Sequence, residues 1–148
     1  MESSKSKIIK EIAQELDSGN DCYYNPKTDE IISIPNFSNF SDEDEFRDCF
    51  KADLKKVKKN KKVLIKIEAL ESYESFKIME QFIEHITDVV FKTELEIILQ
   101  NKKPFQNFKN SIDNSDFRQE WFDFKELELE KIVETQLNRA RASSQHSI

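Results

Sequence analysis

The chain has 148 residues, and its 29 Asp and Glu residues outnumber its 23 Lys and Arg residues, giving a formal net charge of −6. The single glycine excludes, in their standard forms, nucleotide-binding loops and the hydrolase nucleophile elbow, because each needs several glycines. Two distant cysteines, the lack of a signal-peptide pattern and the lack of a membrane-length apolar run predict a soluble cytoplasmic protein with free thiols.

The first 35 residues predict a helix followed by a β-hairpin. Apolar residues recur at helical spacing over 6–17, and Gly19 suits the left-handed position that ends a helix. Tyr and Ile residues flank the turn-forming residues 25–29, which predicts a hairpin over 21–35 that Pro35 ends.

A helix and a third strand are predicted next. Residues 36–45 form a loop into a helix that Ser41 caps, and apolar residues from Phe46 to Val57 keep helical spacing. The acids at 42–48 suit this helix start, and they lack the central glycine of a calcium loop. The lysine run ends the helix, and β-branched residues in 62–70 predict a strand that pairs with the hairpin.

The C-terminal half is predicted to be helical. We expect helices over 72–86, over 88–101, from Pro104 to Asn114, and over 116–140 with Ser115 as cap. The inward side chains of the first of these helices are expected to be Phe76, Met79, Phe82, Ile83 and Ile86. The fold class is therefore α+β, with a small three-stranded antiparallel sheet, packed helices and a helical C-terminal half. We expect one domain over 1–142 and a disordered tail over 143–148.

The lysine-rich block is the part of the chain best suited to bind a polyanion, since residues 51–66 hold eight lysines and one acid. On a continuous helix, four of them share one face: Lys51, Lys55, Lys58 and Lys62. Such a stripe can neutralise phosphates. The run contains no aromatic ring for base stacking, and cations also suit a helix C-terminus, so a solvated helix end is the favoured interpretation.

A second candidate is the aromatic-rich stretch 101–124. Phe105, Phe108 and Ile112 form one helical stripe, and a second contains Phe117, Trp121 and Phe124, continued by Leu127. The functional interpretation is an aromatic-basic surface for nucleic acid or a phosphorylated ligand, formed by Lys102, Lys103, Lys109, Arg118 and Trp121. Helical periodicity favours packing of the rings in the core instead.

Catalytic and metal sites find little support. The two histidines, His85 and His146, show no metal-binding spacing with each other or with cysteine, so we expect no metal, and we expect no cofactor. Catalysis by His85 as a base, with Cys22 or Cys49 as nucleophile, stays open as an alternative, and we assign no catalytic residue.

The segments "KPFQNFKNSI" and "EWFDF" resemble the signature of uncharacterised protein family 0158, a family of small bacterial proteins. That pattern reads Gly-Lys-Gly-Ala-Phe-Arg-Arg-Phe-Lys-Asp, followed by Trp-Tyr. Lys102, Phe105, Phe108, Lys109, Trp121 and Phe122 match or nearly match it, whereas Asn101 and Lys103 replace its glycines and Gln106 and Asn107 replace its arginine pair. "YYNPKTDEIISI" and "FKIMEQFI" are similar to other family segments. The resemblance implies no catalytic residue.

Three functions follow in order of preference. The first is a non-enzymatic interaction module with a protein partner. The second is a nucleic-acid-associated protein that uses Lys55, Lys58 and Lys59 in the block 51–62, together with Lys102, Lys103 and Lys109. The third is an enzyme with an unrecognised site, built around His85 or paired carboxylates.

Overall fold

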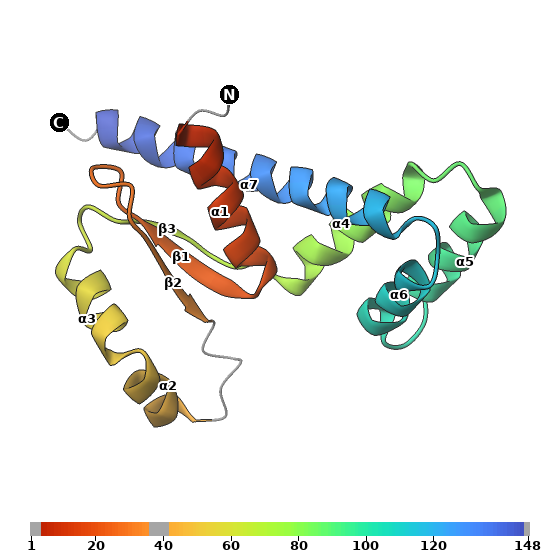
Figure 1. Cartoon of the computed structure of the whole chain (residues 1–148), viewed down its shortest axis with the longest axis horizontal. Helices are drawn as coiled ribbons and strands as arrows, with labels where there is room; N and C mark the ends of the chain where they lie inside the picture. The colour runs from red at the N-terminus through yellow and green to blue at the C-terminus, as the bar shows by residue number, and fades with distance from the viewer. Residues whose placement is uncertain (1–3, 36–41, 147–148) are drawn as a thin grey trace. The chain divides into compact units, whose positions relative to one another are not determined.

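The computed structural model describes residues 4–35 and 42–146, with side chains described over 5–35 and 42–141. Within these ranges a three-stranded sheet is combined with seven helices (Figure 1), which confirms the predicted α+β class and helical C-terminal half. The chain divides into two compact units, one formed by residues up to Leu70 with Leu129 onward, the other by Glu71–Glu128. Each unit is described by itself.

The sheet of the first unit is built on the predicted hairpin. β1 (Asn20–Tyr24) lies between β2 (Ile31–Pro35) and β3 (Ile65–Ile67), and both pairings are antiparallel. The turn is closed by Asp29, which has a φ of 63° and accepts a 2.6 Å hydrogen bond from the Tyr24 hydroxyl. The third strand was predicted over 62–70 and is shorter, with three residues.

The core of the first unit lies between one face of the sheet and two helices. Cys22, Tyr24 and Ile67 are buried on this face. α1 (Ser4–Asp17) and the later part of α7 (Arg118–His146) cover them with a set of buried apolar side chains: Ile9, Ile12, Ala13, Leu16, Leu129, Val133 and Leu137. The predicted first helix is thereby confirmed, while α7 extends beyond the predicted end near residue 140.

The predicted helix after the hairpin is two helices, so that prediction was wrong. α2 (Glu43–Cys49) and α3 (Lys51–Lys59) are separated at Phe50, whose φ and ψ of −118° and 22° are not helical. The predicted cap Ser41 lies outside the described residues, and the Asp42 side chain accepts a hydrogen bond from the Asp44 backbone N–H instead. α3 packs against β2, on whose outer face Ile32 and Ile34 are buried.

The second unit is helical, as predicted. It contains α4 (Ser72–Glu84), α5 (Val89–Leu99), α6 (Pro104–Asp113) and the first part of α7. Its centre is a group of aromatic rings: the Trp121 ring lies 5.2 Å from that of Phe82 and 5.0 Å from that of Phe108. Phe108 and Ile112 are 1% and 0% exposed, so the interpretation of these rings as core is confirmed at its centre.

The margins of the two predicted aromatic stripes differ from expectation. Phe105 is 43% exposed and Leu127 is 59% exposed, so the prediction that both face inward was wrong. Phe76, Phe117 and Phe124 are half-buried. The reason is geometric: α6 begins at Pro104, so Phe105 stands in its first turn, where only its edge contact with the Phe76 ring at 6.2 Å is described.

Candidate interaction surface

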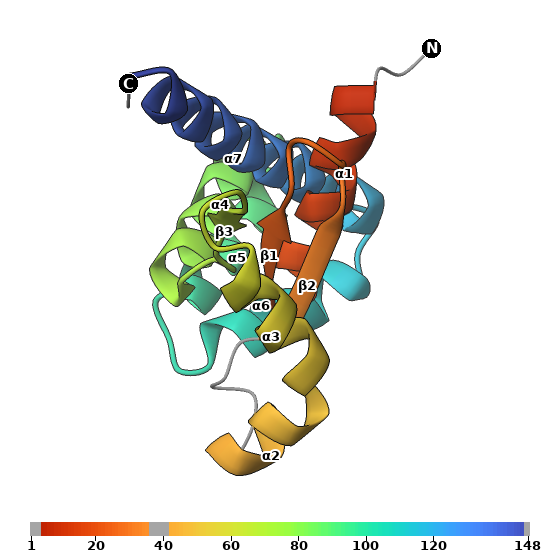
Figure 2. The ribbon, with the colours of Figure 1, turned by 90° about the vertical axis from the view of Figure 1, so that its left-hand side faces the viewer.

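The feature that stands apart from both cores is the helix pair α2–α3, residues 43–59, which we call the arm. Neither of its helices contains a buried residue. In Figure 1 the arm lies beside the sheet, and in Figure 2 α2 extends beyond it. An amphipathic helix normally buries one stripe against its own domain, whereas α3 packs on β2 without fully burying any of its own side chains, and this calls for a physical explanation.

An open groove of about 880 Å³ runs along the arm. Two apolar side chains, Phe46 and Leu54, line it, and both are half-buried. The remaining lining side chains are charged: Glu43, Asp48, Arg47, Lys51, Lys55 and Lys58. The groove therefore offers an apolar surface bordered by charges of both signs.

The charges of the arm are segregated by helix. The first turn of α2 is acidic, and the last turn of α3 contains Lys56, Lys58 and Lys59. Each set lies at the helix end whose dipole favours it, which explains locally why these short helices form. Within α2, Arg47 donates to Glu43 at 2.7 Å, an exposed pair one helical turn apart.

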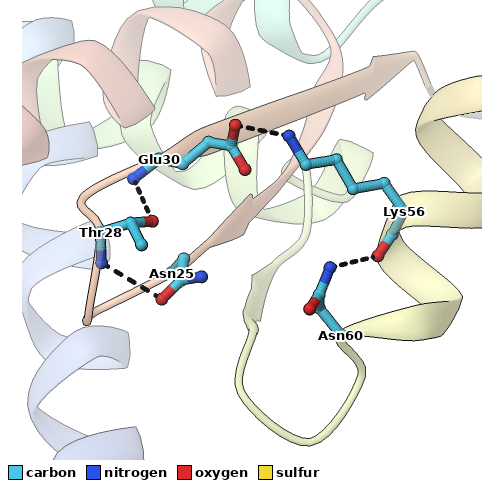
Figure 3. A network of polar contacts seen from close by, with 5 residues as sticks. All are labelled: Asn25, Thr28, Glu30, Lys56 and Asn60. Atoms are coloured by element: carbon cyan, nitrogen blue, oxygen red, sulfur yellow. Dashed lines mark hydrogen bonds and ion pairs between the residues drawn. The ribbon is translucent and has the colours of Figure 1, made fainter.

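One ion pair fastens α3 to the hairpin (Figure 3): Lys56 Nζ lies 2.6 Å from Glu30 Oε2. The turn before Glu30 is held by Asn25, whose Oδ1 accepts from the backbone N–H of Thr28 at 3.4 Å. At the other end, Asn60 Nδ2 donates to the Lys56 carbonyl oxygen at 2.9 Å. The Lys56 side chain therefore forms a contact within the first unit, which distinguishes it from the other lysines of α3.

The predicted lysine stripe is incomplete in the structure. α3 ends at Lys59, so Lys62 follows the helix and does not continue its face, and that part of the prediction was wrong. Lys55 and Lys58 line the groove, Lys59 is exposed, and no ion pair of these three is found within residues 4–35 and 42–146. Their binding role stays a prediction.

The candidates of the second unit differ in exposure, and their binding role stays a prediction. Lys102, Lys103 and Lys109 are exposed at α6, but the Trp121 ring is 9% exposed and belongs to the core. Arg118 contacts a different ring: its guanidinium lies 4.8 Å from the centre of the Phe122 ring. The lysine block at 51–62 and these α6 lysines lie in different units.

The cationic neighbours of Phe122 were not predicted from the sequence. Besides Arg118, the Lys125 ammonium lies 5.3 Å from the centre of the Phe122 ring. The spacing i−4 and i+3 around an aromatic residue was the available signal, because it places both cations on the ring's side of a helix. Arg118 Nε also lies 3.4 Å from Asp113 Oδ1.

The remaining candidate catalytic groups are His85 in the second unit and Cys22 and Cys49 in the first. His85 is exposed, and its ring lies 5.3 Å from the Phe124 ring. Cys49 is exposed, whereas burial raises the pKa of the Cys22 thiol to about 11. Among the described residues, no three His, Cys, Asp or Glu side chains form a group able to hold a metal ion. The described helices also include none with the length and apolar character required to cross a membrane.

Comparison with known proteins gives one match. The family model described as Uncharacterised protein family (UPF0158) matches residues 3–142. This is the family that the aromatic signature and the hairpin sequence predicted, and the match extends over nearly the whole chain. No curated protein and no solved structure matches the chain.

Proposed function

This chain belongs to the uncharacterised protein family UPF0158, and we propose that it is a non-enzymatic module that binds a protein partner through the groove of the arm. The observation that carries the proposal is the absence of buried side chains from α2 and α3, although both present apolar residues. Phe46 and Leu54 in the groove are the apolar contacts that a partner would cover.

Helix length supports this proposal. α2 and α3 have 7 and 9 residues, and helices below roughly 12–15 residues are marginal without packing. Their described connections to the rest of the unit include the Lys56–Glu30 pair and the packing of α3 on β2. A partner that covers Phe46 and Leu54 would supply the burial that the arm lacks.

The mixed charge of the groove favours protein over nucleic acid. Phosphate groups would meet Glu43 and Asp48 as well as the lysines, and like charges held close together are unfavourable. A protein surface can carry positive and negative groups and place each one opposite a groove residue of the other sign.

We also propose that the protein works in the cytoplasm of a bacterium. Cys22 and Cys49 are both free thiols, which is the ordinary state of cysteine in a reducing compartment. The exposed position of Cys49 supports the proposal further, because an oxidising compartment would leave that thiol open to intermolecular pairing.

The experiment that tests the binding proposal is site-specific photocrosslinking in living cells. A benzophenone side chain at Leu54 should give a covalent adduct with a protein, because the groove is where a partner would lie. The matched control is Ile97, an exposed apolar residue at 55% exposure on α5, which should give none. No adduct at Leu54, or equal adducts at both positions, would contradict the proposal.

A second candidate function is nucleic-acid binding, favoured by the exposed Lys55, Lys58 and Lys59. It predicts binding to single-stranded RNA or DNA whose affinity falls steeply with salt. Reversing the three charges to Glu should weaken that binding, while Lys7→Glu on α1 serves as a single-charge control. If titration at low salt detects no binding, this candidate is dropped.

A further inference from the structure

We infer that the arm pairs with the arm of a second copy of this chain, with α2 of each copy on α3 of the other. The inference rests on the proposed function and names its partner. A twofold contact of this kind requires a surface that is complementary to itself, because each residue then faces a residue of the same patch in the partner.

The charge distribution of the arm meets that requirement. α2 contains four acids and Arg47, for a net charge of −3, while α3 contains five lysines and Asp53, for a net charge of +4. Two arms in the same orientation would place like charges together. Two antiparallel arms place each acidic helix on a basic one.

The side chains that line the groove show the same segregation of charge between the two helices. Glu43 and Asp48 come from α2, and Lys51, Lys55 and Lys58 come from α3. The apolar Phe46 and Leu54 come one from each helix. Antiparallel pairing therefore brings the apolar side chains of both copies together, between two sets of opposite charges.

The groove cations are available for such a contact. The described ion pairs of the arm use Arg47 with Glu43 and Lys56 with Glu30, and none described involves Lys51, Lys55 or Lys58. Because the arm is short and the charges are exposed, we expect a weak dimer, with a dissociation constant on the order of micromolar, that salt dissociates.

The test is a charge exchange between two variants, followed by sedimentation velocity at low and high salt. Variant A carries Lys55→Glu and Lys58→Glu, which lowers the net charge of α3 from +4 to 0 and leaves the groove lining net acidic on both helices. Variant B carries Glu43→Lys and Asp48→Lys, so its arm is more basic. Each alone should be monomeric at concentrations where the unchanged chain dimerises, and an equimolar mixture should form a heterodimer.

Recovery in the mixture also shows that both variants are folded. The matched control reverses Lys102 and Lys109, two exposed lysines of the second unit, and should leave the dimer unchanged. A monomeric unchanged chain at low salt, or a mixture of A and B that stays monomeric, would overturn the inference. If Leu54 nevertheless crosslinks to a different protein, the proposed function stands without the dimer; if it crosslinks to nothing, both fall.

Discussion

Lys56 on α3 and Glu30 at the hairpin turn form an ion pair with a 2.6 Å separation between Nζ and Oε2, across 26 residues of sequence. Their side chains are 48% and 43% exposed, so solvent screens the pair and its contribution to stability is at most about 1 kcal/mol. The pair matters for the position of α3, because it joins this helix, which has no buried residue, to the hairpin of the sheet.

The first prediction concerns this attachment. Lys56→Met keeps the length of the side chain and removes its charge, so α3 should open more often while the global free energy of unfolding changes by less than about 1 kcal/mol. Hydrogen exchange should show lower protection in α3 and unchanged protection in α1. Lys59→Met, which leaves the Glu30 pair intact, is the control. Equal protection of α3 in both variants would show that the pair does not hold the arm.

The second prediction compares two phenylalanines of α6. Phe108 is 1% exposed and its ring meets that of Trp121, so Phe108→Ala should lower the free energy of unfolding by about 3–5 kcal/mol. Phe105 is 43% exposed, and Phe105→Ala should cost about 1 kcal/mol. Urea denaturation followed by Trp121 fluorescence measures both. Similar losses would contradict the assignment of Phe105 to the surface.

The contrast between these rings shows what periodicity predicts and what it leaves open. Phe105 and Phe108 have the same three-residue spacing as a buried pair, and the spacing correctly places Phe108 and Ile112 in the core. It does not say where the neighbouring helices end. Whether a first-turn residue such as Phe105 is buried depends on its tertiary neighbours. The same holds for Leu127, because an apolar stripe predicts which face of a helix points inward but not whether another element covers that residue.

The candidate surface was less predictable than the fold. Apolar spacing continues without interruption from Phe46 to Val57, so nothing in the pattern marks the break at Phe50. The break shortens each helix, and the lysine stripe stops before Lys62 because α3 itself ends at Lys59. The hairpin was predictable because its turn residues act locally, whereas the Glu30–Lys56 contact joins distant segments that no local rule connects.

The third prediction concerns Lys103, which has a φ of 53° at the residue before α6. Left-handed backbone costs a residue with a Cβ roughly 1 kcal/mol or more, and the resembled family signature has glycine at this position. Lys103→Gly should therefore leave the free energy of unfolding unchanged or raise it by up to about 1 kcal/mol. Lys102→Gly, at a position without positive φ, should lower it by roughly 0.5–1 kcal/mol. Thermal unfolding of both variants measures these changes, and an equal loss of stability in the two would contradict the prediction.

The fourth prediction is a pH dependence of stability caused by Cys22. Burial, and secondarily the nearby carboxylates of Glu15, Asp21 and Glu11, raise the pKa of its thiol from 9.0 to about 11 in the folded chain. Between these values the unfolded chain loses the thiol proton and the folded chain keeps it. The unfolded state then binds fewer protons, so stability falls as pH rises from about 9 to about 11, by at most about 1.4 kcal/mol per pH unit.

Denaturant unfolding at several alkaline pH values measures this slope for the unchanged chain and for Cys22→Ala. Tyr24, whose pKa is also raised by burial, contributes a fall with the same sign above its ordinary value of 10. Since Tyr24 is present in both proteins, the difference between their slopes isolates Cys22. The unchanged chain should show the steeper fall in stability between pH 9 and 11. If Cys22→Ala has that same slope, the thiol does not titrate as its burial requires, and the packing of β1 against α1 and α7 is looser than described.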